Sequence, residues 1–375
     1  MTPLSRRDAL KATATAAAGL AAAAVLPGGL AAANPPAPGV RFGVVGISHP
    51  HIYGMVDAVA RGGGALVAFH SDEPDLAAAF AQHYPHARQV GDERAILEDP
   101  SLPLVLSSIV PDQRAPLGVR VMQHGKDYLV DKPGIITLDQ LALARRVQAE
   151  TKRIYAIMYS ERFENAATVR ASELARAGAI GEVVQTVGLG PHRINPPTRP
   201  EWFWDPARYG GIICDIGSHQ FDQFLYFTNS TRGEIVASQV RNVRHAEHPK
   251  FQDFGDVMVR GNGGTGYIRV DWFTPAGLPT WGDTRLTVLG TDGYMEVRKN
   301  VDIAGREGAD HLFLADAKGV RHIDCNAVEL PFGRLFVQDV LHRTETAMPQ
   351  AHCFLATALA LQAQQRAQPV VLGRG

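Results

Sequence analysis

The N-terminal part of the chain alternates short apolar runs with longer amphipathic segments. The apolar runs have the length of buried strands, whereas the longer segments carry apolar residues at helical spacing. The expected strands are 40–45, 66–69, 104–110, 127–130 and 154–158. The expected helices are 52–61, 75–84, 95–97, 116–124 and 138–151. Strands that alternate with helices predict an α/β fold with a parallel sheet, which binds ligands beyond the carboxyl ends of its strands.

The stretch 210–222 carries the clearest chemical signal in the sequence. Two glycines open it, and Asp215, His219 and Asp222 follow at spacings that place them on one stripe of a helix. Their neighbours are largely apolar, so we expect this helix to be buried and its polar side chains to be satisfied. Histidine can take or give a proton near neutral pH, which favours a catalytic over a structural role for His219.

The end of the first predicted strand, at 46–51, is similar to a dinucleotide-binding turn but incomplete. Of the three glycines in Gly-x-Gly-x-x-Gly only Gly46 is present, while Ser48 and His51 stand at the second and third positions. Ser48 could donate to a phosphate, or it could simply cap the following helix. One of His49 and His51 could replace the missing glycine contacts to a cofactor.

The end of the second predicted strand offers an acid for a ribose hydroxyl. Ser71 and Asp72 stand there, about one residue later than usual. No Arg or Lys lies in 68–73 to accept a 2′-phosphate, so the sequence favours NAD over NADP, with NADP still possible.

Lys132 stands at the rim of the predicted sheet. It follows the strand 127–130 and precedes a proline, which holds it extended. A lysine there is either a substrate or cofactor contact or a surface charge beside Asp131.

The composition limits the classes of protein to which the chain can belong. The chain has 375 residues, which suggests about two domains, and its 45% hydrophobic content is ordinary for a globular protein. The net charge is −1 and no basic run is present, which argues against nucleic-acid binding. The three cysteines are far apart, so neither a disulfide framework nor a zinc finger is expected.

The first residues resemble a twin-arginine export signal. Ser5-Arg6-Arg7-Asp8-Ala9-Leu10-Lys11 precedes an alanine-rich run that is short for a spanning helix. We therefore expect a signal peptide at 1–33, a spacer at 34–39, a mature protein without a stable membrane anchor, and a periplasmic or secreted location. An ordinary secretory signal or a short membrane anchor is the alternative.

The combined motifs resemble one enzyme family. A Rossmann-like start, Asp-Lys-Pro at 131–133 and Gly-Gly-x-x-x-Asp-x-Gly-x-His-x-x-Asp at 210–222 are similar to the glucose–fructose oxidoreductase, inositol dehydrogenase and rhizopine-catabolism (Gfo/Idh/MocA) family. The segments 159–163, 179–184 and 286–297 resemble its domain junction, the opening of its second domain and a strand pair. The segment 111–114 departs from the family's Pro-Asn-x-x-His, with Arg114 in place of the histidine.

This resemblance implies two domains and a redox site. A Rossmann-like domain, 40–158, would bind NAD or NADP. An α+β domain, 159–375, would carry the substrate site and a large open, mainly antiparallel sheet, commonly used for oligomerisation as a dimer or tetramer. The implied catalytic residues are Lys132, Asp215 and His219. The implied cofactor contacts are Gly46, Ser48, His49, His51, Ser71, Asp72, Pro111 and Lys132.

The resemblance also implies how the reaction is divided among the residues. His219 would take a proton from a sugar or polyol hydroxyl, Lys132 would stabilise the developing alkoxide, and Asp215 would position the substrate. Further substrate contacts are expected at Arg162, His192, Arg193 and Asp222. The aromatic segment 202–204 is expected to pack in the core rather than to stack on a sugar.

Three functions remain open from the sequence. The first is an NAD(P)-dependent oxidoreductase with a tightly held cofactor, acting on a sugar or polyol. The second is an NAD-retaining, redox-neutral glycoside hydrolase or lyase. The third is a non-catalytic sugar-binding protein, or a metal-site enzyme in which His49, His51, His192 and His219 converge; without a regular ligand spacing we assign no metal ligands.

Overall fold

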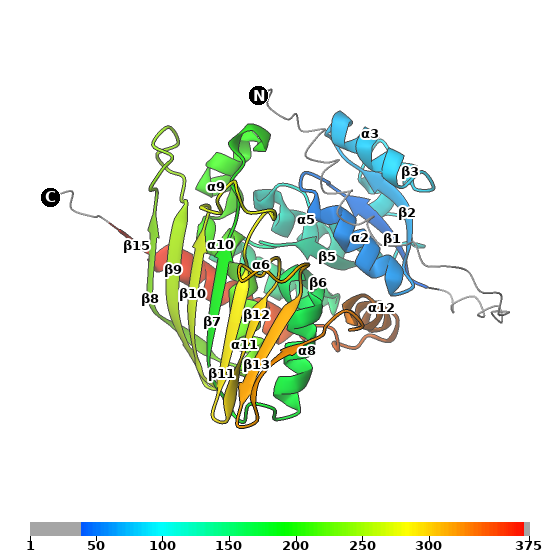
Figure 1. Ribbon diagram of the computed structural model, residues 1–375. Coiled ribbons are helices and arrows are strands. Elements are labelled where there is room, and N and C mark those ends of the chain that lie inside the picture. The colour runs from blue at the N-terminus through cyan, green and yellow to red at the C-terminus, as the bar shows by residue number, and fades with distance from the viewer. Residues whose placement is uncertain (1–38, 371–375) are drawn as a thin grey trace.

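The computed structural model describes residues 39–370 and contains two sheets that lie side by side (Figure 1). The expected signal peptide at 1–33 and all but the last residue of the spacer lie outside the described residues. The first sheet occupies the blue-to-teal part of the chain, and the second occupies the green-to-orange part together with the short red strand near the C-terminus.

The first sheet has six parallel strands in the order β3-β2-β1-β4-β5-β6. Its strands are β1 (Arg41–Val45), β2 (Ala65–His70), β3 (Arg88–Gln89), β4 (Leu104–Ser107), β5 (Asp127–Asp131) and β6 (Tyr155–Met158). Its helices are α2 (His51–Arg61), α3 (Pro74–His83), α4 (Arg94–Leu97), α5 (Pro111–Gln123) and α6 (Leu138–Thr151). The predicted parallel sheet is therefore confirmed, and every residue of β4, β5 and β6 is buried, as is typical of a sheet covered on both faces.

Helix α5 begins five residues earlier than the expected start at 116. Pro111 takes the first helical position, where the missing N–H costs nothing, and Pro116 lies inside the helix. The carbonyl of Asp112, which Pro116 cannot use, accepts a hydrogen bond from Gln140 Nε2 at 3.1 Å. This tertiary contact from α6 is not visible in a local pattern.

The second sheet has nine strands in the order β14-β13-β12-β11-β7-β10-β9-β8-β15. The pairs β7–β10 and β8–β15 are parallel and the other neighbours are antiparallel. Its strands are β7 (Val183–Pro191), β8 (Gly233–Arg241), β9 (Phe254–Gly261), β10 (Thr265–Asp271), β11 (Arg285–Gly290), β12 (Gly293–Arg298), β13 (His311–Asp316), β14 (Gly319–Ile323) and β15 (Gln368–Pro369). The expected large, mainly antiparallel sheet is confirmed.

Helices cover only one face of this second sheet (Figure 1). The helices that pack on its strands are α8 (Ala166–Arg176), α10 (Ile212–Asp215), α11 (Gly217–Phe227) and α13 (Gln350–Arg366). The short α7 (Ser160–Phe163) and α9 (Pro206–Tyr209) pack on other helices, and the 3₁₀ turns η1 (Pro196–Thr198) and η2 (Glu201–Trp204) precede α9. Helix α11 packs so closely that a Cβ at Gly188 of β7 would lie 2.6 Å from the Gln220 side chain. This close packing fixes the position of α11, and of the residues it carries, on the sheet.

The C-terminal part of the chain is helical. It contains two helices, α12 (Phe332–His342) and α13, separated by a segment that ends at Pro349. Helix α12 packs against α2 of the first domain, where a Cβ on Gly62 would lie 2.2 Å from the carbonyl oxygen of Gly333. The chain thus returns to its first domain after completing the second sheet. The proposed boundary near residue 158 stays a prediction.

Among residues 39–370, no helix has the length and apolar character needed to cross a bilayer.

Candidate active site

Lys132 and Asp215 meet where the two domains face each other. Lys132 follows β5, and Asp215 ends α10 of the second domain. The Nζ of Lys132 donates to Oδ1 of Asp215 at 3.0 Å, and the two side chains are 6% and 14% exposed. This ion pair joins residues 83 positions apart in the sequence and brings together two of the three predicted catalytic side chains.

The expected helical stripe of Asp215, His219 and Asp222 is only partly correct. Asp215 closes the four-residue α10, and a turn at Ile216 separates it from α11, which carries His219 and Asp222. Asp215 faces Lys132, whereas Asp222 is bound by a different partner, Arg162. The two acids therefore belong to separate ion pairs, because the helix is interrupted between them.

His219 is buried beside a network of polar side chains. Burial, the largest influence, lowers the pKa of His219 to about 4, while the nearby charge of Glu161 acts in the opposite direction. Its Nδ1 is buried without a hydrogen-bond partner in the described structure. The positive charge of Lys132 also lowers this pKa, so the two side chains lie within electrostatic reach of each other. At neutral pH His219 is therefore uncharged and able to accept a proton.

Glu161 and Lys299 form a buried ion pair that the sequence did not reveal. Lys299 Nζ donates to Glu161 Oε2 at 2.6 Å and to Gln223 Oε1 at 2.7 Å, and Gln220 Nε2 donates to the same Glu161 oxygen at 3.0 Å. Burial opposes ionisation of Glu161, but the charges of Lys299 and His219 hold its pKa at about 2. The other oxygen of Glu161, Oε1, is buried and unpartnered in the described structure.

His192 lies at the same site, at the end of β7. Burial is the main cause that lowers the pKa of His192 to about 3, and Lys132 is the next. Its Nδ1 lies 3.1 Å from the carbonyl oxygen of Gly190, which fixes the proton on Nδ1 and leaves Nε2 as an acceptor. The ring packs 4.6 Å from the ring of Trp281, which is 51% exposed. An exposed indole beside a neutral imidazole suits the face of a sugar.

Arg193 forms hydrogen bonds with the loop that carries Trp281. Its backbone N–H donates to the carbonyl of Trp281 at 2.7 Å, and its guanidinium donates to the carbonyls of Pro275 and Leu278. The predicted substrate contact at Arg193 stays a prediction, and the hydrogen bonds found give it a role in loop placement. Phe203 is buried in the core, as expected for the segment 202–204, and contacts Trp272.

Arg162 and Asp222 bind each other rather than projecting into open space. Arg162 donates from Nε to Oδ2 at 2.6 Å and from Nη2 to Oδ1 at 2.7 Å, and Asp222 is fully buried. The His352 Nε2 lies 2.8 Å from the same Oδ1. The polar atoms of this pair are engaged within the protein, which favours a structural role over the substrate contacts expected from the sequence.

His49 and His51 both turn toward Asp131. The Nδ1 of His51 lies 2.9 Å from Oδ1 of Asp131, and the Nδ1 of His49 lies 3.5 Å from Oδ2. The buried guanidinium of Arg114 binds the same carboxylate at 3.0 Å. Burial disfavours the Asp131 anion, yet His51 and Arg114 together hold its pKa well below the usual value. The histidine convergence suggested by the sequence thus includes only this pair, while His192 and His219 lie with Lys132 and Glu161.

The other predicted cofactor contacts lie along the carboxyl edge of the first sheet. Gly46 has φ +77°, and a Cβ there would lie 2.5 Å from Ile109, so the turn requires glycine. Asp72 is 95% exposed just after β2, and Ser71 accepts a hydrogen bond from the N–H of Glu73. The first N–H groups of α2 are engaged locally: that of His51 donates to Nδ1 of His49, and those of Ile52 and Tyr53 donate to the carbonyls of His49 and Pro50. These features fit a dinucleotide, with Asp72 available to a ribose and Pro111 at the start of α5.

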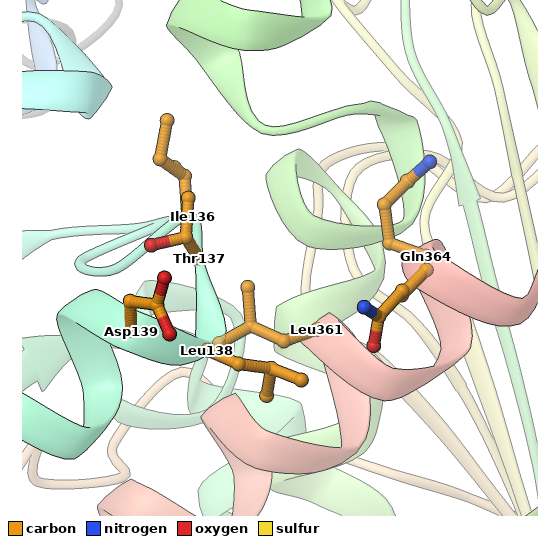
Figure 2. A pocket seen from close by; sticks show the side chains of 7 residues that line it. Ile136, Thr137, Leu138, Asp139, Leu361 and Gln364 are labelled. Carbon is orange, nitrogen blue, oxygen red and sulfur yellow. The ribbon is translucent and has the colours of Figure 1, made fainter.

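A separate cleft of about 320 Å³ lies between the start of α6 and α13 (Figure 2). Ile136, Thr137 and Asp139 line one wall, and Leu361 and Gln364 line the other. It contains none of the predicted catalytic side chains.

The strand order 3-2-1-4-5-6, the open second sheet and the lysine, carboxylate and histidine between them define a two-domain oxidoreductase. A family model described as the GFO/IDH/MocA C-terminal domain matches residues 168–296. The chain is similar to a protein from Erwinia carotovora atroseptica SCRI1043 that is described as an oxidoreductase and whose crystal structure is known. The two sequences are 42% identical and the two structures superpose with a TM-score of 0.86, over 88% of this chain and 100% of that chain. The chain belongs to the Gfo/Idh/MocA family.

Two further relatives carry named activities. The scyllo-inositol 2-dehydrogenase (NAD(+)) of Bacillus subtilis is 24% identical over 75% of this chain and 78% of its own length. A levoglucosan dehydrogenase, solved in complex with NADH and levoglucosan, has a TM-score of 0.72 at 15% identity over 87% of this chain and 97% of its own. The latter likeness concerns the fold alone.

Several residues of the site escaped the sequence reasoning. Glu161 and Lys299 come from segments 138 positions apart, and Arg114 looked like a mere departure from the family pattern. The only local signal for Glu161 was its position next to Arg162 at the domain junction.

Proposed function

We propose that this protein is an NAD(P)-dependent oxidoreductase that acts on a hydroxyl group of a sugar or polyol. The observation that carries the proposal is the Lys132–Asp215 ion pair beside a neutral, buried His219 at the carboxyl edge of the first sheet. The name of the inositol dehydrogenase among its relatives supports the same reaction class.

Different residues of this chain perform the separate parts of the proton transfer. Lys132 donates a hydrogen bond to the substrate oxygen and stabilises negative charge that develops on it. His219, uncharged because burial lowers its pKa to about 4, accepts the hydroxyl proton. Asp215 holds the lysine ammonium in place, and the neutral Nε2 of His192 accepts from a neighbouring substrate hydroxyl.

The cofactor side of the site rests on the edge of the first sheet. Gly46, Ser48, Ser71, Asp72 and Pro111 would hold the dinucleotide, which when bound supplies the nicotinamide ring that accepts a hydride. An exposed Asp72 without Arg or Lys in 68–73 supports NAD over NADP.

We further propose twin-arginine export to the periplasm or beyond, with no membrane anchor on the mature protein and with a tightly held cofactor. The motif at residues 5–11 supports this location. Because a location outside the cytoplasm offers no soluble nicotinamide pool, the cofactor would be restored within the site. Paired oxidation and reduction of two sugars would do this, as would redox-neutral cleavage of a glycoside.

The open face of the second sheet supports a homo-oligomer, a dimer or tetramer. Apolar side chains such as Met258, Leu289 and Val320 are 54%, 42% and 74% exposed on its strands. An uncovered sheet face of this kind commonly marks an interface.

The first experiment releases the cofactor and counts it. The folded mature protein is denatured, and NAD(H) and NADP(H) in the supernatant are assayed against protein concentration. Near-stoichiometric NAD(H) is expected. A protein that releases none and fails to bind added dinucleotide would contradict the redox proposal.

The second experiment tests the proton acceptor. His219→Ala is expected to lower kcat for a confirmed substrate by about 10²–10⁴-fold, as loss of a general base does, while dinucleotide binding persists. His342→Ala, which removes an exposed imidazole at the end of α12, serves as the matched control. Unchanged turnover in His219→Ala would refute the assigned role.

A further inference from the structure

Three potential metal ligands converge at the carboxyl edge of the first sheet. His49 and His51 come from the turn after β1, and Asp131 is the last residue of β5. One ligand atom from each of them lies within 4.8 Å of the other two. The imidazole rings stand edge to face, with centroids 4.1 Å apart. Side chains distant in the sequence thus bring two nitrogens and one oxygen close enough together to share one ion.

The ligand types and their support suit a transition-metal ion. Two imidazole nitrogens and one carboxylate oxygen form a set that zinc and related divalent ions prefer in proteins. Arg114 binds Oδ2 of Asp131 and donates from Nε to the carbonyl of Ile109 at 2.7 Å, so the carboxylate is fixed from behind. A carboxylate oriented by a further hydrogen bond is the usual arrangement around a bound metal.

Hydrogen bonding alone accounts poorly for the position of His49. Its Nδ1 accepts a long hydrogen bond of 3.3 Å from the backbone N–H of His51, so it presents a lone pair. That lone pair lies 3.5 Å from an oxygen of the Asp131 anion. Two electron-rich atoms at this separation repel each other, and a cation between them would turn the repulsion into coordination.

We propose that His49, His51 and Asp131 bind one divalent transition-metal ion of the zinc class. Nδ1 of each histidine and a carboxylate oxygen of Asp131 are the ligands. The His51 side chain is 41% exposed, so the remaining coordination position is open to water or to an exogenous oxygen. Asp131 immediately precedes Lys132, which places the ion beside the proposed reaction site.

The test measures metal binding without any enzymatic readout. The untagged full-length protein is stripped with a chelator and then titrated with Zn²⁺ in competition with a chromophoric chelator. A parallel titration with Co²⁺ records its visible absorption. One ion per chain is expected, with Co²⁺ bands typical of nitrogen and oxygen ligands. Absence of stoichiometric binding by the wild-type protein would overturn the proposal.

Variants identify the ligands. His51→Ala removes an exposed ring and His49→Ala a half-buried one, and each is expected to abolish binding of Zn²⁺ and the Co²⁺ spectrum. His86→Ala, an exposed histidine outside the cluster, is expected to bind as the wild type does. Equal affinity in His51→Ala and the wild type would contradict the ligand set. Thermal unfolding of each variant without metal separates loss of a ligand from loss of the fold, and the cofactor-release assay remains independent of the result.

Discussion

At the scale of single residues, the site depends on charges that are buried and paired. Glu161 and Lys299 are 7% and 4% exposed and bind each other beside His219. A buried charge that loses its partner is strongly destabilising, whereas removal of both charges can be tolerated. Glu161 and Lys299 are therefore expected to be retained or lost together, and they keep the surroundings of the neutral His219 ordered.

Breaking this pair is expected to be costly. Glu161→Gln should lower the free energy of unfolding by about 3–5 kcal/mol, because it leaves the Lys299 ammonium buried without a counter-charge. Adding Lys299→Met to that variant should restore part of the loss. Denaturant unfolding measures the free energy of unfolding of both variants. The control is Glu173→Gln, which breaks the exposed Arg170–Glu173 pair and should lower the free energy of unfolding by under about 1 kcal/mol. A loss for Glu161→Gln no larger than that of this control would contradict the prediction.

The pKa of His219 sets a pH dependence for activity. With a pKa of about 4 instead of 6.5, the imidazole remains an acceptor throughout the mildly acidic range. A profile of kcat/KM for hydroxyl oxidation should therefore show no inflection near pH 6.5 and should fall only as pH approaches 4. An acid limb centred near 6.5, absent from His219→Ala, would show that the ring is less buried during turnover.

The lowered pKa of His219 also makes the free energy of unfolding depend on pH, in a direction that can be predicted. The unfolded chain protonates His219 near 6.5, and the folded protein only near 4. Since the unfolded state binds more protons between these values, the free energy of unfolding decreases as pH falls from 6.5 towards 4. The depressed pKa of Glu161, about 2 against 4.5, removes further stability as pH falls below 4.5.

At the scale of elements, one glycine turn sets the position of α10. Gly211 has φ +84°, and a Cβ there would lie 2.3 Å from Cδ of Gln364 on α13. The Oε1 of Gln364 accepts from the N–H of Ile213, which secures the first turn of α10. Asp215 is thus placed opposite Lys132 by a backbone conformation and a contact with the last helix.

Gly211→Ala is expected to destabilise the protein by about 1–3 kcal/mol, because φ +84° with ψ 160° is a backbone conformation essentially restricted to glycine, with more for the contact with Gln364. Its measured activity should fall further than its stability, because Asp215 shifts with α10. Gly54→Ala is the matched control, since Gly54 is exposed within α2 and a Cβ there meets no atom within 4 Å. That control should be neutral or stabilising by up to about 1 kcal/mol. Equal melting temperatures for the two variants would contradict the assigned strain.

At the scale of the whole molecule, the second sheet separates two functions. Its covered face packs on α11, and its other face presents alternate side chains of the same strands to the outside. Val257 and Ile268 pair on the covered face, whereas their neighbours Met258 and Tyr267 pair on the open one. The regular alternation of strand side chains therefore gives one face to the site and the other to the proposed oligomer.

Met258→Glu is expected to convert the oligomer to smaller species, because a buried carboxylate at an interface lacks a partner. Light scattering after size exclusion measures the mass. Leu143→Glu, at an exposed apolar position on α6, should leave the mass unchanged. If the wild-type protein is already a monomer at micromolar concentration, the open face does not serve this purpose.

Most of the order of elements in the first domain followed from the sequence because most elements there leave a local pattern, whereas the two-residue strand β3 was not predicted. Short apolar runs such as 104–110 are long enough for buried strands, and helical periodicity identified α2 and α6 within a residue or so. The start of α5 was missed because Gln140, on another helix, satisfies the carbonyl that Pro116 leaves free. The break between α10 and α11 was missed because spacing alone cannot show that Asp215 and Asp222 bind different partners.

The sequence by itself predicted the α/β character and the family resemblance, and through that resemblance the candidate triad of Lys132, Asp215 and His219, because these depend on local periodicity and on short motifs. Only the tertiary structure decided which side chains surround the triad. Glu161 and Lys299, and likewise His49, His51 and Asp131, meet through packing between distant segments. Pairing energies inside a protein depend on burial and on the distance between charges, and neither quantity is contained in the linear order of residues.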